Sequence, residues 1–425
     1  MTQPRTHAMT LAIGIVALEF AAAVSTFVSS TLLPAIVRDL SARDAVELLI
    51  AGSTLGLFVA LPLATRVVRR IGSRGTLAAG MVAYVAGTAA SAVSGTAWVF
   101  AGGQFVSGCA SGLLAVFGIS AAIQHLDDQW RMRVIAASSA MWILPALVGP
   151  AATLALEHLV GWRWTLLVPV PVVFAGRVLI LRAAGSERPS DGAERPLWRT
   201  LLVPLGVSGV VLSDWWPFAV GGVALALVGV ASIMPAGTLT ARRGAPAALV
   251  AMTLFAAGYF GADGLITVLL TDGYGASMAR AAVVLSAAPL AWAVTSLAVP
   301  RLKRIGKEPP PAAGLTLTAV AVGALAWGAP VFAVALVAWT LGGVGVGLAY
   351  PCLYLRSTTG AEFGATELAA AVITAEAFGG LLGRAVGGAI VSVGDLGAAY
   401  WMFAGFLGLG AALAVRSKPL LVPQR

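Results

Sequence analysis

Charged side chains are scarce in this 425-residue sequence, at 11% of all residues. Soluble proteins average about 25% charged and roughly 45–50% apolar residues, whereas this chain is 59% hydrophobic, with a mean hydropathy of +0.91. This composition excludes a soluble protein with a large core, because the excess apolar side chains have to face lipid. Alternating segments of about ten residues, typical of transmembrane barrels, are also absent. We therefore expect membrane-spanning helices.

Cysteines and catalytic motifs are equally scarce. The two cysteines, Cys109 and Cys352, lie in or at the end of apolar segments and match no metal-site or disulfide spacing. The sequence contains no G-x-x-x-x-G-K-[ST] phosphate loop and no nucleophile elbow. Its polar loops are too short to hold an active site outside the membrane. We expect neither a metal nor a cofactor, and we predict that the chain is not an enzyme.

What the sequence does contain is a series of apolar runs from Met9 to about Val415, each long enough to cross about 30 Å of hydrocarbon as a helix. The weakest pair is 197–213 and 217–235, because the first run is short and contains Pro204. Twelve spans, with that pair lying on the membrane surface, are therefore the alternative. The fourteen predicted spans are residues 9–36, 47–66, 76–95, 98–123, 134–157, 163–182, 197–213, 217–235, 246–270, 281–300, 312–328, 330–353, 368–392 and 396–415.

Basic residues orient these spans. With a cytoplasmic N-terminus, 21 of the 27 lysines and arginines fall in inside loops, and four, Arg38, Arg43, Arg163 and Arg280, fall outside. Membrane topology thus explains the formal charge of +9 and the pI of about 10.2, so we do not expect nucleic-acid binding. Both termini are predicted to be cytoplasmic.

A polar segment after the sixth span divides the chain into two halves, and one three-residue sequence occurs in both halves. The sequence RIG at 70–72 recurs at 304–306, in the inside loop after the second span of each half. Parallel six-helix repeats fit one transporter architecture. The predicted domains are an N-terminal six-helix bundle (1–182), a cytoplasmic linker (183–196), a transmembrane hairpin (197–235), a C-terminal six-helix bundle (246–415) and a cytoplasmic tail (416–425).

Several local motifs resemble those of the major facilitator superfamily, and within it the fourteen-span drug/proton antiporters. Residues 142–150 (WILPALVGP) resemble the antiporter motif of the fifth helix, and 161–164 (GWRW) the turn into the sixth. Residues 69–74 (RRIGSR) are similar to the signature loop between helices two and three. Residues 103–108 (GQFVSG) and 25–34 (STFVSSTLLP) are similar to the fourth-helix motif and to the end of the first helix. The resemblance implies an all-α membrane protein with the major facilitator fold.

The resemblance also implies roles for individual residues, with departures from the family pattern. Arg69 replaces the acidic residue of the signature loop, Gln104 the arginine of the fourth helix, and Ser25 the acidic residue of the first. The family's conformational lock and proton relay therefore cannot be transferred unchanged. Cavity-lining candidates are Ser25, Gln104 and Trp142. Gating candidates are Arg69, Arg70, Gly72, Arg74, Pro145, Gly149 and Pro150, where the prolines are expected to kink the fifth span.

Three acidic residues lie well inside predicted spans: Glu19, Asp263 and Glu376. An ionised group in hydrocarbon costs at least ~2.5 kcal/mol on insertion scales, so each should face a cavity, a partner or water. Depth along the helices places Asp263 level with Arg384, which predicts an ion pair. Glu19 and Glu376 lie nearer mid-membrane and are candidates for binding a proton or a cationic substrate. Arg177 is close enough to a helix end to extend to the membrane surface.

These observations predict a secondary transporter that exports small amphipathic compounds, cationic or neutral, by alternating access, driven by inward proton flow. Alternatives are a dedicated exporter of an endogenous metabolite and a transporter-like receptor that no longer transports. The expected partners are the substrate, protons and the lipid bilayer, with a monomer as the functional unit. Arginine outnumbers lysine 24 to 3, a bias expected of a high-GC bacterium, so the predicted location is the bacterial inner membrane.

Overall fold

The computed structural model describes residues 5–42, 45–183, 197–211, 216–307, 309–327, 331–360, 362–392 and 395–418. Within these ranges the chain is helical and contains no strand, which confirms the all-α prediction. The helices are α1 (Arg5–Asp39), α2 (Val46–Ala92), α3 (Ala97–His125), α4 (Asp128–Ala140), α5 (Ile143–Thr165), α6 (Pro169–Ala183), α7 (Leu197–Val211), α8 (Trp216–Ile233), α9 (Ala245–Val268), α10 (Met278–Arg304), α11 (Pro311–Trp327), α12 (Phe332–Ser357), α13 (Ala365–Ser392) and α14 (Leu396–Val415).

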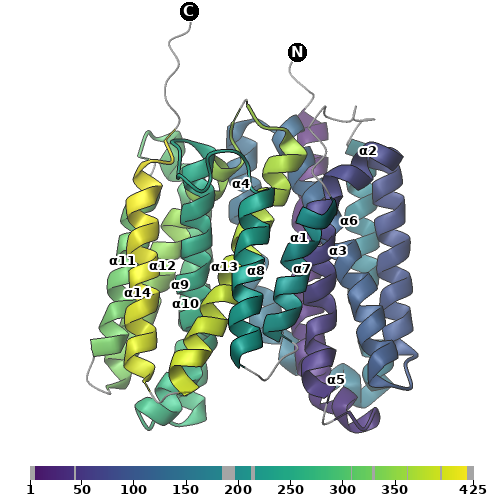
Figure 1. The fold of residues 1–425 in the computed structure, drawn as a ribbon, viewed down its shortest axis with the longest axis horizontal. Helices are drawn as coiled ribbons and strands as arrows, with labels where there is room; N and C mark the ends of the chain where they lie inside the picture. Colours follow the sequence, from purple (N-terminus) through teal and green to yellow (C-terminus); the bar gives the residue numbers. More distant parts are fainter. Residues whose placement is uncertain are drawn as a thin grey trace, which may run out of the picture. The chain divides into compact units, whose positions relative to one another are not determined.

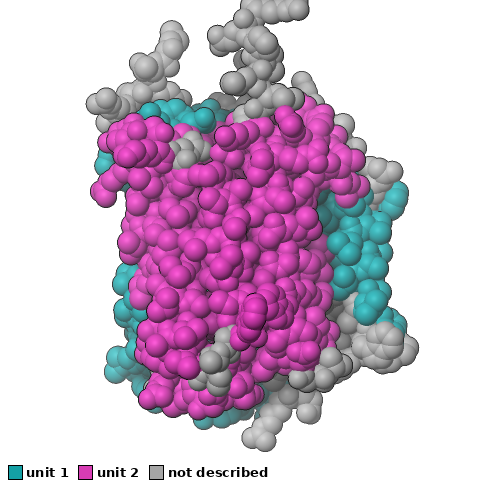
Figure 2. All heavy atoms as spheres, turned by 90° about the vertical axis from the view of Figure 1, so that its left-hand side faces the viewer, with its two compact units in different colours: residues 1–130, 144–234, 364–370 teal, residues 131–143, 235–363, 371–425 magenta. Residues whose placement is uncertain are grey.

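The helices fall into two compact units, which Figure 2 colours separately. Unit 1 comprises residues 1–130, 144–234 and 364–370, and unit 2 comprises residues 131–143, 235–363 and 371–425. The boundaries differ from the predicted halves in that each unit includes a short segment from the other half of the sequence. Most of α4 belongs to unit 2, and the first turn of α13 belongs to unit 1.

Helix packing within each unit joins helices that are neighbours in the chain and helices that are far apart in it. In unit 1, α2 packs along α3, and α1 packs against α6 and α3. In unit 2, α11 lies beside both α12 and α14, while α9 contacts α14 and α12 and α10 contacts α12 (Figure 1). The aromatic residues of α9, α10 and α12 are thereby brought together.

The predicted hairpin is present as α7 and α8, which pack against each other and attach to unit 1 through α2. α7 has 15 residues, or about 22 Å of helix, which is shorter than the ~20-residue length of a typical span. Its crossing of the membrane therefore stays a prediction. The turn of the hairpin at 212–215 and the linker at 184–196 lie outside the described residues.

Helix length and composition agree with the predicted spans. In the part of the chain that the structure describes, eight helices are long and apolar enough to cross a membrane, or up to ten if each of two bent pairs is one span. Three shorter apolar helices are Pro169–Ile180, Val220–Ile233 and Pro311–Trp327. Together with α7, these elements correspond one to one with the fourteen predicted spans.

The fifth predicted span, 134–157, is bent, as its prolines predict. The chain forms α4 and α5 here, with a break at Met141 and Trp142 and a bend of 46° between Asp128–Pro145 and Leu147–Thr165. Pro145 explains the position of the break, because its nitrogen has no hydrogen to donate to the carbonyl of residue 141, four positions earlier. The expected proline kink therefore lies at Pro145.

The repeated triplet marks the same backbone feature in both halves. Gly72 and Gly306 have φ angles of +70° and +74°, a region that glycine adopts without the steric cost of a side chain. Gly72 breaks α2 into its two spans, and Gly306 follows the end of α10. The repeated triplet therefore marks two equivalent turns, one after the second span of each half.

Glycines of α13 allow close packing against α9 in unit 2. A methyl group added at Gly379 would overlap the carbonyl oxygen of Thr253, and one added at Gly383 would overlap that of Ala257. Gly388, one turn further along α13, has no atom within 4 Å of the corresponding position. The α9–α13 contact is therefore backbone against backbone, which small residues favour in membrane bundles.

We predict that Gly383→Ala lowers the thermal stability of the purified protein, because the new methyl group has to displace the α9 backbone. Overpacking of this kind typically costs about 1–3 kcal/mol. Gly388→Ala is the matched control: it makes the same change on the same helix, where space is open. Unfolding temperatures measured in detergent check this, and equal values for the two variants would contradict the observed packing.

Candidate functional site

Seven aromatic side chains of unit 2 form one connected group, here called the aromatic cluster. Trp292 lies at its centre, with its ring centroid 5.2 Å from that of Tyr350 and 5.5 Å from that of Tyr259. Tyr259 in turn stacks on Trp339, at 5.5 Å with the ring planes 4° apart. The members, from α9, α10 and α12, are Phe255, Tyr259, Phe260, Trp292, Trp339, Tyr350 and Tyr354.

The aromatic cluster has a buried side and an accessible side. Phe255, Tyr259 and Trp339 are at most 2% exposed, so they form a rigid backing. Phe260, Trp292 and Tyr350 are half-buried. These three rings are therefore the more exposed part of the cluster, here called its accessible side.

Glu376, one of the predicted site residues, lies at this accessible side. The hydroxyl of Tyr350 donates to the Glu376 carboxylate, with its oxygen 3.2 Å from Oε1 and 3.1 Å from Oε2. The carboxylate is half-buried on α13. A carboxylate hydrogen-bonded to a tyrosine that packs against Trp292 is a composition suited to an organic cation, since aromatic ring faces and the carboxylate both attract positive charge.

Three buried donors of the aromatic cluster have no hydrogen-bond partner among the described residues. They are the hydroxyl of Tyr259 and the indole nitrogens of Trp292 and Trp339. An unsatisfied buried donor costs about 1–3 kcal/mol. The cluster therefore combines apolar surface, a carboxylate and unused donors, which is the mixture typical of small-molecule sites.

Asp263 and Arg384 lie on adjacent helices of unit 2 and attract each other electrostatically. The side chain of Arg384 lies against two glycines. A Cβ atom added to Gly264 would lie 3.3 Å from Cγ of Arg384, and one added to Gly380 would lie 3.5 Å from its Nη2. In the described part of the chain, no hydrogen bond or ion pair within 4.0 Å joins the two side chains. The predicted direct pairing is not formed in this structure and stays a prediction for other states of the protein.

The remaining predicted polar residues belong to unit 1. Glu19 is half-buried on α1. Ser25, also on α1, interacts with the hydroxyl of Tyr84 of α2. Gln104 is buried and donates from Nε2 to Oγ of Ser91 at 3.2 Å, so its side chain joins α3 to α2. Glu19 belongs to unit 1 and Glu376 to unit 2, so they are separate candidates for binding a proton or a cation.

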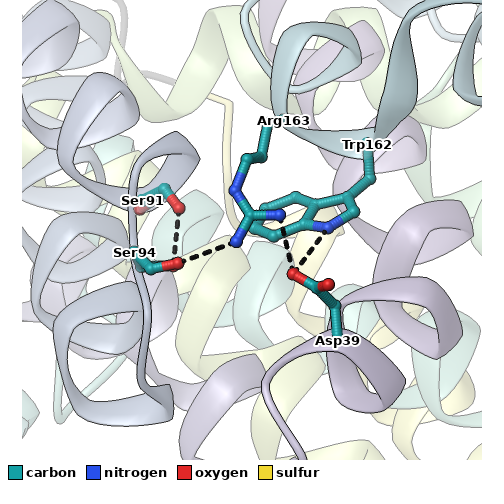
Figure 3. Close-up of polar contacts among 5 residues, drawn as sticks. All are labelled: Asp39, Ser91, Ser94, Trp162 and Arg163. Carbon is teal, nitrogen blue, oxygen red and sulfur yellow. Dashed lines mark hydrogen bonds and ion pairs between the residues drawn. The ribbon is translucent and has the colours of Figure 1, made fainter.

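A polar cluster of unit 1 surrounds Arg163 in the GWRW turn (Figure 3). Arg163 donates from Nη1 to Oδ2 of Asp39 at 2.7 Å and from Nη2 to the Ser94 carbonyl at 3.1 Å. The indole of Trp162 donates to the same Asp39 oxygen at 3.2 Å, and the guanidinium lies 4.3 Å from the Trp162 ring centroid. These contacts tie the ends of α1, α2 and α5 together, which is a structural role.

The gating candidates lie at breaks and bends of unit 1 and its flanking segments. Arg69 is half-buried, whereas Arg70 and Arg74 are exposed on either side of the Gly72 break. Trp142 is 39% exposed at the break before α5. A Cβ at Gly149 would lie 3.3 Å from Cβ of Phe27 on α1, and Pro150 follows inside α5. Their placement is compatible with hinges and does not by itself assign a gating role.

The expectation for Arg177 is wrong. Its side chain is only 3% exposed, and neither terminal guanidinium nitrogen has a hydrogen-bond partner in the part of unit 1 that the structure describes. The neighbouring Gly176 packs against α1 at Gly14 and Ala17. Arg177 is thus held within the helix packing rather than extended to a surface.

The aromatic cluster was not predicted from the sequence, although two signals point to it. Five of the six tyrosines lie after residue 250. Phe255 and Tyr259, and likewise Tyr350 and Tyr354, are four residues apart, so each pair lies on one face of its helix. What the sequence does not give is the contact between those faces, which depends on how α9, α10 and α12 pack.

Comparison with known proteins places these features in context. The family model described as the Major Facilitator Superfamily matches residues 15–375. Two Mycobacterium tuberculosis proteins described as probable multidrug-efflux transporters are 24% identical over 444 residues, covering 93% of this chain and 91% of theirs. A triacylglyceride transporter of Mycolicibacterium smegmatis is 26% identical over 178 residues, covering 41% of this chain and 32% of its own.

Solved structures show the same fold at low sequence identity. The human organic anion transporter has a TM-score of 0.73 at 14% identity, with 97% of this chain and 100% of that chain covered. The Escherichia coli fucose:proton symporter has a TM-score of 0.66 at 15% identity, covering 96% and 98%. These similarities confirm the fold that the local motifs predicted.

We predict that Asp263 and Arg384 are energetically coupled. Asp263→Asn and Arg384→Gln should each lower the unfolding temperature, because each leaves its former partner without a nearby opposite charge, and the double variant should recover part of the loss. Coupling energies for neighbouring residues are about 0.5–3 kcal/mol. Strictly additive losses in a double-mutant cycle would show that the two charges do not interact.

Proposed function

The chain belongs to the Major Facilitator Superfamily of membrane transporters, and from that premise we propose that it exports small amphipathic compounds, cationic or neutral, in exchange for protons. It is a multi-pass membrane protein and a transporter rather than an enzyme. The observation that carries the proposal is the Glu376 carboxylate, hydrogen-bonded to Tyr350 at the accessible side of the aromatic cluster. The description of the mycobacterial relatives as multidrug-efflux transporters supports export as the direction.

The proposed substrate chemistry follows from the groups present. Phe260, Trp292 and Tyr350 offer ring faces to a flat or apolar body, and Glu376 offers a negative charge to a cationic group. The unpartnered indole donor of Trp292 suits an ether or carbonyl oxygen. A neutral compound would use the rings and the donor without the carboxylate.

Proton coupling follows from competition for one carboxylate. A proton and a cationic substrate cannot both be held by Glu376, so binding of one releases the other. One proton moving through 100 mV supplies about 2.3 kcal/mol, which corresponds to roughly a fifty-fold gradient if coupling is tight. Glu19 is proposed as a second protonation site in unit 1, because it too is a half-buried carboxylate within a spanning helix.

We further propose that the protein works as a monomer in the bacterial inner membrane with both termini in the cytoplasm. The 21 to 4 bias of basic residues toward one side supports this orientation. A dedicated exporter of one endogenous metabolite, or a transporter-like receptor that no longer transports, would have the same fold. A substrate panel separates the three: transport of several unrelated cations supports the first, transport of one compound the second and transport of none the third.

Glu376→Gln is expected to abolish proton-driven transport of a cationic probe such as ethidium in proteoliposomes, because the amide keeps the shape and the Tyr350 contact but cannot ionise. Glu367→Gln, on the same helix and outside the aromatic cluster, is the matched control and should retain transport. Unfolding temperatures confirm that both variants are folded. Normal transport by folded Glu376→Gln would refute the proposed role of this carboxylate.

Glu19→Gln tests the second protonation site. If Glu19 couples transport to protons, the variant should lose proton-driven accumulation of cations but still equilibrate them down their own gradient, and transport of neutral substrates should suffer less. Uptake with and without an imposed pH difference makes the distinction. Unchanged accumulation in the variant would leave Glu376 as the carboxylate that both binds and couples.

A further inference from the structure

The C-terminal end of α10 carries a basic pocket that the proposed transport function does not use. It has a volume of about 260 Å³ and lies wholly within unit 2. Among the described residues, three arginines and no acidic residue line it. The lining residues are Arg133, Ala136, Leu297, Pro300, Arg301 and Arg304.

The wall that α4 contributes is firmly held. Arg131 is buried and donates from Nη2 to the carbonyl and hydroxyl oxygens of Thr358, both at 2.7 Å. Met132 packs with Val299 of α10 and Cys352 of α12 in a buried apolar group. Arg133, the next residue of α4, is thereby fixed beside the arginines of α10.

The arginines of α10 are available to a ligand. Arg301 and Arg304 are exposed, and their guanidinium groups make no hydrogen bond or ion pair with any other described residue. Guanidinium groups bind phosphate oxygens through paired hydrogen bonds. Three of them around one pocket therefore favour a phosphate group, and the pocket is smaller than the ~300–1,000 Å³ of sites that enclose a whole small molecule.

An apolar stripe on α10 leads to this pocket. Leu290, Val294 and Leu297 are exposed, with Val294 at 68% and Leu297 at 48%, and their spacing of four and three residues continues to Arg301 and Arg304. One face of the helix is thus apolar along its middle and basic at its end. From Leu290 to Arg301 the helix rises about 16 Å, which is close to half of the ~30 Å hydrocarbon thickness.

We propose that the pocket and the stripe bind one anionic phospholipid of the leaflet that contains the C-terminal end of α10. The phosphate lies among Arg133, Arg301 and Arg304, and an acyl chain lies along Leu297, Val294 and Leu290. Basic pockets between membrane helices bind anionic head groups in this way. The match in both charge and length favours a lipid over a soluble phosphate, which would use the arginines alone.

The test uses the delipidated full-length protein in detergent, with bound lipid counted by native mass spectrometry and unfolding temperature measured in parallel. Phosphatidylglycerol should bind and raise the unfolding temperature, and phosphatidylcholine should bind at least tenfold more weakly. Arg301→Gln combined with Arg304→Gln should weaken phosphatidylglycerol binding at least tenfold, since hydrogen bonds to charged groups are lost. Arg280→Gln, at the opposite end of the same helix, should leave binding unchanged.

Two further measurements distinguish binding of a phospholipid from binding of soluble phosphate. Leu297→Gln should weaken phosphatidylglycerol binding without affecting any response to inorganic phosphate. If inorganic phosphate stabilises the protein as much as phosphatidylglycerol does, the site is one for a soluble anion and the lipid proposal is overturned. Equal phosphatidylglycerol binding by the wild type and the double arginine variant would overturn the site itself.

Discussion

The lack of water in the hydrocarbon core of a membrane is the constraint on which the rest of this structure depends. Every backbone donor and acceptor in that region has to be satisfied within the protein, which leaves helices as the building element here. The helices depart from regular geometry at residues that tolerate it: Gly72 at a positive φ angle and Pro145 at the break before α5. The same constraint makes each carboxylate within a span costly. Glu19, Asp263 and Glu376 therefore stand out against a background with few charges.

The structure handles those carboxylates in different ways. Asp263 lies near the positive charge of Arg384, an arrangement that offsets its cost within unit 2. Glu376 accepts a hydrogen bond from the hydroxyl of Tyr350, a member of the aromatic cluster. The first arrangement is compatible with a fixed structural role. The second joins a carboxylate to the aromatic cluster, and for that reason the proposed substrate site is centred on Glu376.

Much of the fold could be predicted from the sequence, because its signals are local. The lengths of the apolar runs and the charges of the loops indicate the spans, and the repeated RIG triplet indicates two related halves. The fourteen apolar segments, each present as helix in the structure, and the bend at Pro145 follow from such local signals. The division of the fifth span into α4 and α5 could also have been anticipated from the donor that Pro145 lacks. The site was only partly predictable: Glu376 is visible as a lone acid, whereas the grouping of Trp292, Tyr259 and Tyr350 depends on the packing of three helices. Arg177 differs from expectation for the same reason, since its burial by a neighbouring helix is not encoded in its own segment.

In the proposed mechanism, a proton and a cationic substrate compete for the Glu376 carboxylate. Proton release on addition of a saturating cationic substrate to purified protein, in weakly buffered detergent solution, measures this competition most directly. The wild type should release protons to an extent that depends on pH, and Glu376→Gln should release none and bind the cation more weakly. Equal proton release from the wild type and Glu376→Gln would contradict this mechanism and place the competition at another carboxylate.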